Sequence, residues 1–335
     1  MRKIVFILTA LLIFSSCADN QFKVDTSKIE LSFEAKRLDV DLFEFTIENA
    51  PEKIKFLNDK YGDFFEVYNA QILKIGTSSG VDYALRLSEF IQYCNDENIT
   101  DSVHAVFKQT DNTEQLITEA LKHHKYYFPE KETPEIVMFI SAFNESVVTV
   151  ENTVGIALDK YLGEKSSFYE RLGIEKYLRR RMTPEAIPAD VMRALAMAEY
   201  PFESTSDALM EHMLYEGKIQ YYLNCMLPET ADSIKWRYTQ KQFRWAQNNE
   251  ENVWNYLVEN KKLFETDRLQ VRQYVGDAPF STPFTDVSAP RIGVYVGYKI
   301  ILAYMKNSPD TDLKTLMQNA DYQSILSKSK YNPKN

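Results

Sequence analysis

The sequence predicts an α+β fold that is mainly α-helical and contains a small β-sheet. Apolar and aromatic residues recur three and four positions apart over residues 51–128, two β-rich apolar segments follow between 135 and 159, and helical spacing returns after Thr183. With 44% hydrophobic residues in a chain of 335, a sizeable core can be buried. We expect a mostly helical region over 29–130 to pack with residues 131–335 as one globular unit.

The chain begins with the features of a secretory signal. Two basic residues precede an apolar stretch, residues 4–14, which is too short to be a permanent membrane span. Two serines and then Cys17 follow, as in the lipobox of bacterial lipoproteins, where the thiol is acylated. We therefore expect a signal peptide over 1–16, a lipid such as palmitate on Cys17 and a polar tether over 17–28. The alternative is an ordinary signal peptide followed by an incidental cysteine.

Charge and cysteine content narrow the possible partners. The formal net charge is −9, and removal of residues 1–16, which include two basic and no acidic residues, makes it more negative. An acidic chain is a poor partner for nucleic acid. The other cysteines, Cys94 and Cys225, are either paired or two buried free thiols, and the sequence favours free thiols.

The first half of the chain alternates between two kinds of spacing. Residues 29–45 show stretches of period two, which predict one or two short strands leading into a helix. Residues 51–128 have helical spacing, and their aromatic residues are expected in the core. Pro129 and Pro134 end this pattern, and the apolar segments EIVMFISAF and VVTVENTVGIALD predict a strand pair.

The second half is predicted to be helical. Residues 183–200 and 206–223 form two candidate helices, with Asp190 as a possible cap of the first and Ser206 or Asp207 of the second. A helix over 291–307 carries two glycines, Gly293 and Gly297, four residues apart. Each glycine costs about 1 kcal/mol relative to alanine in a helix, so this spacing indicates a close backbone approach.

A short basic run, YLRRRM, spans Tyr177 to Met182 in this otherwise acidic chain. It is most simply a solvated loop or helix end. The alternative is a contact with a partner or a phosphate group.

Many separate stretches resemble one known family. They occur in order and include KRLDVDLFEF, YGDFFEVYNAQILKIG, GIALDKYLG, MTPEAIPADVMRA, MLYEGKIQYYLNCMLPETAD and SAPRIGVYVGYKI. Together with the lipobox, they resemble the GldB gliding-motility lipoproteins over the whole mature chain. The resemblance implies a lipoprotein anchored in the outer membrane, facing the periplasm, that works with other envelope proteins in gliding.

That family is also distantly similar to zinc peptidases, which implies a degenerate zincin-like core within residues 131–335. Their first metal helix carries HExxH and their second supplies a glutamate before a glycine. Here Glu216 and Gly217 fit the second helix, whereas Met192, Arg193 and Ala196 stand where the histidines and the catalytic glutamate belong. This departure predicts no catalytic residues, no metal and no cofactor.

Helical geometry places Glu216 on an apolar side of its helix, while Glu211 and Lys218 share another side that we expect to face water. A carboxylate directed into an apolar interior is costly unless a charge or hydrogen bonds compensate it. The preferred partner is a guanidinium group, from Arg193 or Arg291, in a bidentate pair. The alternatives are a network with His212 and tyrosines, or a metal.

These observations favour an envelope lipoprotein that binds other components without catalysis. One alternative is a zinc-dependent peptidase that uses Glu216 and His212. The other is a binder of cell-wall or glycan fragments in a cleft lined by aromatic residues such as Tyr215, Trp236 and Trp245.

Overall fold

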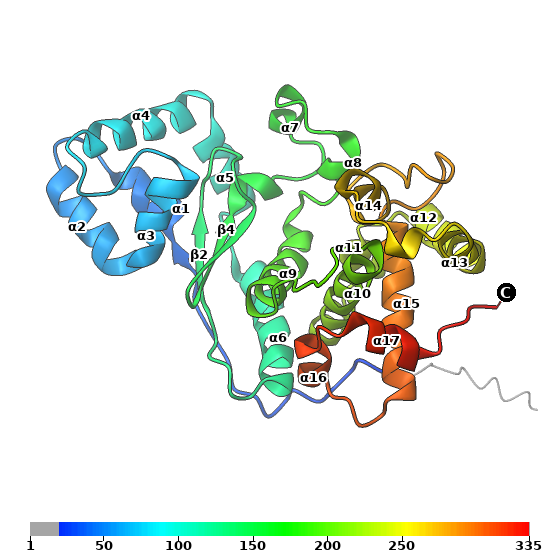
Figure 1. The fold of residues 1–335 in the computed structure, drawn as a ribbon. Coiled ribbons are helices and arrows are strands. Elements are labelled where there is room, and N and C mark those ends of the chain that lie inside the picture. Colours follow the sequence, from blue (N-terminus) through cyan, green and yellow to red (C-terminus); the bar gives the residue numbers. More distant parts are fainter. Residues whose placement is uncertain (1–19, 335) are drawn as a thin grey trace, which may run out of the picture.

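The computed structural model describes residues 20–334, and Figure 1 shows their arrangement. The predicted signal peptide and Cys17 lie outside the described residues. The predicted tether is described from Asn20, and it lies against the folded body. Asn20 Nδ2 donates to the Pro228 carbonyl oxygen at 2.8 Å, and the ring of Phe22 meets that of Tyr221 edge-on, with 5.2 Å between centroids.

A four-stranded mixed sheet lies between two groups of helices, in the order β1-β2-β4-β3. β1 and β2 are parallel, as are β2 and β4, while β3 and β4 form an antiparallel hairpin. The strands are β1 (Lys36–Arg37), β2 (Glu135–Phe139), β3 (Val147–Val150) and β4 (Thr153–Ala157). The α+β class is confirmed, and the β-rich segments form three strands where the sequence predicts a pair.

One face of the sheet packs against the first helices of the chain. Val137 and Phe139 of β2 join the hydrophobic cluster of this side, and Gly155 of β4 leaves room for the ring of Phe64. The elements of this side are α1 (Leu38–Asp41), η1 (Leu42–Glu44), α2 (Ala50–Tyr61), α3 (Asp63–Val67), the π-helical turn η2 (Tyr68–Ile72) and α4 (Tyr83–Asp96).

The other face carries a larger cluster that includes Ile136 and Met138 of β2. Alternate β2 residues therefore serve two cores, as period-two geometry requires. The larger cluster also contains residues of α5 (Ile99–Val106) and α6 (Asp111–Tyr127). Residues on both sides of position 130, where the sequence divides the chain into two regions, therefore share this core.

The remaining helices form the second half of the molecule (Figure 1). The longer ones are α9 (Ile187–Glu199), α10 (Leu209–Met226), α12 (Gln240–Asn248), α13 (Glu250–Glu259), α14 (Arg268–Val275), α15 (Ile292–Asn307) and α17 (Tyr322–Ser329). The short ones are η3 (Leu158–Tyr161), α7 (Ser167–Arg171), α8 (Lys176–Arg179), η4 (Pro184–Ala186), α11 (Asp232–Trp236), η5 (Lys262–Phe264) and α16 (Leu313–Gln318). None of the helices between residues 20 and 334 has the length and apolarity of a membrane span.

Helices α10 and α15 meet at glycines, which confirms the close approach predicted for α15. A Cβ atom added to Gly297 would lie 1.8 Å from the Met213 carbonyl oxygen, and one added to Gly217 would lie 2.5 Å from the Gly297 carbonyl carbon. The two backbones approach so closely that neither Gly217 nor Gly297 has room for a side chain.

The prediction of a solvated side on α10 is wrong. The Glu211 carboxylate is buried and accepts hydrogen bonds from Thr205 Oγ1 and the Ser206 backbone N–H. The buried Lys218 Nζ donates to the carbonyl oxygens of Met317 and Asn319, at 3.1 and 2.8 Å. The C-terminal segment around α16 therefore covers Lys218, and the segment before α10 covers Glu211.

The predicted helix caps are also wrong. The N-cap residue of α9 is Ala186 and that of α10 is Ala208, and neither makes a side-chain capping bond. Asp190 lies inside the first turn of α9, where its carboxylate accepts from Tyr161 Oη at 2.9 Å and from Arg237 Nη2 at 2.7 Å. The Asp190 carboxylate therefore pairs with Arg237 and does not cap the helix.

Candidate functional site

Three of the predicted site residues come together where α9, α10 and the start of α15 meet. Arg193 of α9 and Arg291, which precedes α15, both direct Nη2 at the Oε2 atom of Glu216 on α10. The Arg291 contact measures 2.9 Å. The exposed fractions of the three side chains are 15% for Arg193, 17% for Glu216 and 8% for Arg291. The preferred guanidinium partner is present twice, and both arginines share one carboxylate oxygen where a bidentate pair was predicted.

The backbone before α15 places Arg291 in this position. Arg291 has a left-handed conformation with φ of 50°, which is uncommon for a residue with a side chain. The Tyr238 hydroxyl donates to the Pro290 carbonyl oxygen at 2.6 Å and holds the turn. The guanidinium group also donates through Nε to the Val275 carbonyl oxygen at 3.4 Å.

The charges at this centre perturb one another. Burial raises the pKa of the Glu216 carboxyl, but the positive charges of Arg193 and Arg291 outweigh it, so the net pKa lies below the ordinary value of 4.5. Burial and the neighbouring charge of Arg193 lower the pKa of Arg291 to about 10, against the raising effect of Glu216. At neutral pH the centre therefore consists of one carboxylate and two guanidinium cations.

A second set of ion pairs continues from Arg291. Asp277 Oδ1 lies 3.9 Å from Arg291 Nε, and Oδ2 accepts from Arg181 Nη1 at 2.7 Å. Burial raises the pKa of the Asp277 carboxyl, but Arg181, Arg291 and Arg237 bring it to about 2. Asp277 and Arg237 were not among the predicted site residues, and Arg181 was predicted only as part of the basic run.

His212 has other partners. Its Nε2 lies 2.7 Å from Asp207 Oδ1, and its ring packs on Phe202 with 4.4 Å between centroids. His212 and Glu216 thus share one helix but belong to separate contacts, which departs from the predicted site that groups them. Across residues 20–334, no cluster of three or more His, Cys, Asp or Glu side chains is arranged to hold a metal ion.

The three aromatic residues predicted to line one cleft lie in three separate environments. Tyr215 is buried and donates to the Tyr200 carbonyl oxygen at 3.1 Å. Trp236 is buried among Tyr238, Tyr295 and Tyr298 but forms part of the wall of a cavity, and Trp245 packs against Phe284. Cys94 and Cys225 are both buried free thiols.

A family model described as gliding motility protein GldB matches residues 19–333. The label of that family, GldB_lipo, includes the abbreviation for lipoprotein. No curated protein and no solved structure matches the chain.

Proposed function

This chain belongs to the GldB family of gliding motility proteins, and we propose that it acts in the cell envelope by binding another component rather than by catalysis. The proposal rests chiefly on the state of Glu216. Its Oε2 atom accepts hydrogen bonds from two guanidinium groups, which supply the positive charge that a metal supplies in a zinc peptidase. Glu216 is thus a structural ion-pair partner in this proposal.

Electrostatics and side-chain chemistry both support this assignment. A cation near Glu216 would face the charges of Arg193 and Arg291 at short range, in a site where water screens poorly. The α9 residues that flank Arg193 in the zincin-like register, Met192 and Ala196, are buried and carry neither a ligand nor a general base. The core is then zincin-like in arrangement and has no hydrolytic role.

We further propose that Cys17 is lipidated and anchors the chain in the outer membrane with its body in the periplasm. Because Asn20 is bound to the Pro228 carbonyl oxygen, the anchor would also fix which surface of the protein is near the membrane. Three residues of extended chain span at most about 10 Å, so the surface around Pro228 would lie close to the membrane. Replacement of Cys17 by alanine should move the protein from the membrane fraction to the soluble fraction.

Capture of a partner tests the binding role. A photo-reactive residue is placed at exposed surface positions of the full chain in the native envelope, and cross-linked products are identified with wild type and with Glu216→Gln. We expect the same partner in both, at reduced yield where the variant is less stable. A peptidase activity that requires Glu216, in a variant that folds and melts like wild type, would refute the proposal.

A further inference from the structure

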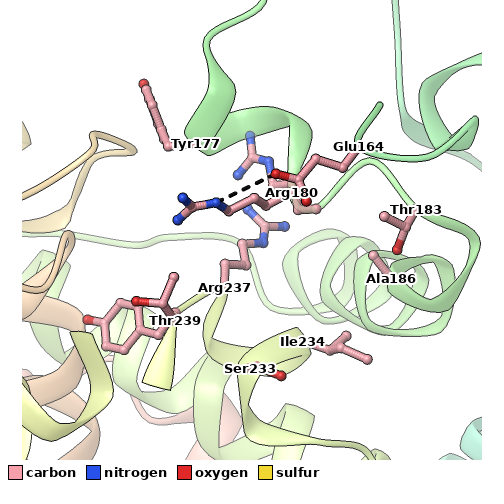
Figure 2. A pocket seen from close by; sticks show the side chains of 11 residues that line it. Glu164, Tyr177, Arg180, Thr183, Ala186, Ser233, Ile234, Arg237 and Thr239 are labelled. Carbon is pink, nitrogen blue, oxygen red and sulfur yellow. Dashed lines mark ion pairs between the residues drawn. The ribbon is translucent and has the colours of Figure 1, made fainter. Parts of the chain in front are cut away.

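The basic run at Tyr177–Met182 borders a cavity of about 280 Å³. Its walls come from the end of α8, the loop that leads to α9, and α11 with the residues after it. Figure 2 shows Arg180 directed toward Glu164, with Arg237 rising from the opposite wall. A neighbouring cavity of about 30 Å³ shares part of this wall and is also lined by Asp277 and Arg291.

The lining of the two cavities is rich in positive charge. Arg180, Arg181, Arg237 and Arg291 line them, against two carboxylates, Glu164 and Asp277. This is a local excess of two positive charges in a chain whose formal net charge is −9. Inclusion of the ion-pair partners in the adjoining layer, Asp190, Glu216 and Arg193, leaves one positive charge in excess.

The counter-ions leave guanidinium groups available at the cavity. Arg237 is bound to Asp190 through Nη2 and Arg181 to Asp277 through Nη1, so in each case one of several donors is engaged. Arg180 Nε lies 3.8 Å from Glu164 Oε1, a looser contact between half-exposed side chains. Burial first, and then the like charges of Arg193 and Arg237, lower the pKa of Arg291.

We propose that this cavity binds the oxyanion of a small organic ligand, a carboxylate or a phosphate ester, with Arg180, Arg181 and Arg237 as its charged contacts. The proposal rests on the binding function above and names the chemistry of the ligand. Guanidinium groups present planar pairs of donors that match both oxyanions. The hydroxyls of Thr183 and Ser233 add polar lining, and Ala186 and Ile234 offer apolar wall to the carbon part of the ligand. The volume suits a small molecule or one end group of a larger one.

The test uses the full chain in detergent, titrated calorimetrically with N-acetylglycine as carboxylate and glycerol 3-phosphate as phosphate ester, at constant ionic strength set with chloride. We expect saturable binding of at least one probe at one site per chain, and the tighter probe identifies the source of the oxyanion. Arg180→Ala should weaken that binding about tenfold, as expected for loss of one charge-assisted contact of about 1.4 kcal/mol. Because Arg180 and Glu164 are 47% and 44% exposed, this variant is expected to fold.

Arg171→Ala is the matched control. Arg171 pairs with Glu97 at 3.3 Å with similar exposure, so the variant removes the same charge at another place on the molecule. Arg237→Lys keeps the charge beside Asp190 and loses the planar fork, and it should also weaken binding. Absence of saturation by both probes, or equal weakening by Arg171→Ala and Arg180→Ala, would overturn the assignment. Such a failure leaves partner capture unaffected, whereas a Glu216-dependent peptidase activity would overturn the binding function even if the cavity takes an anion.

Discussion

Arg193 on α9 donates a hydrogen bond to the Glu216 carboxylate on α10 and so joins these two helices. The same carboxylate oxygen accepts from Arg291, 75 residues further along the chain. One acid therefore links α9, α10 and the start of α15. The pattern predicts that charge balance, more than the identity of any single side chain, sets the stability of this centre.

A double-mutant cycle tests that balance. Glu216→Gln leaves the partly buried Arg193 and the buried Arg291 facing one another and should lower the free energy of unfolding by about 3 kcal/mol, as for other broken buried pairs. Arg193→Met combined with Glu216→Gln removes one charge of each sign and should recover much of this loss. Denaturant unfolding of the four proteins measures the coupling. Additive effects would contradict the account.

Acidification should erase the contribution of Glu216. Its folded pKa lies below the ordinary 4.5, so the stabilisation is complete above pH 4.5 and is lost as pH falls through the folded pKa. The stability difference between wild type and Glu216→Gln should therefore shrink from pH 6 to pH 3 in thermal unfolding. A stability difference that stays constant from pH 6 to pH 3 would mean that the carboxylate charge of Glu216 does not cause the stabilisation.

Lys218 should affect stability at alkaline pH, because burial lowers its pKa from 10.5 to about 8. Between these two values the unfolded chain holds a proton that the folded chain has released, so Lys218 makes stability rise with pH. Lys218→Met should remove that rise, seen as the wild-type-minus-variant difference between pH 8 and pH 10.5. Lys306→Met, on the exposed side of α15, is the control and should leave the slope unchanged.

The contact between α10 and α15 should tolerate no side chain at Gly297. Gly297→Ala would place Cβ against the Met213 backbone, and we expect it to cost at least about 2 kcal/mol despite the better helix propensity of alanine. Gly293→Ala is a graded control in the same helix, since its nearest neighbours lie at 3.0 to 3.1 Å and include the flexible Met213 side chain. Equal losses in the two variants would contradict the packing described.

Local pattern in the sequence was enough to predict the fold class and part of the centre. Spacing alone indicated the close approach at Gly293 and Gly297, and the position of Glu216 on its helix demanded a compensating charge. The solvated side predicted for Glu211 and Lys218 failed for two reasons. The Glu211 carboxylate is bound by the segment just before α10, and Lys218 is covered by Met317 and Asn319, about 100 positions away. Helical periodicity carries no information about such coverage.

The charged residues that were not predicted at the site also have partners far away in the sequence. Arg181 meets Asp277 across 96 positions and Arg237 meets Asp190 across 47, and neither pair has a local signature. Asp190 fits the pattern of a helix cap, yet it lies inside the first turn of α9 and serves a tertiary ion pair. His212 and Glu216 have the spacing of two metal ligands on a helix, but the His212 ring is paired with Asp207.

The zinc content of the full chain, purified from its native envelope without chelators, decides whether arginines or a metal ion neutralise Glu216. Because Arg193 and Arg291 neutralise Glu216, wild type and Glu216→Gln should contain the same amount of zinc, far less than one ion per chain. One zinc per chain in wild type, lost in Glu216→Gln, would contradict this prediction.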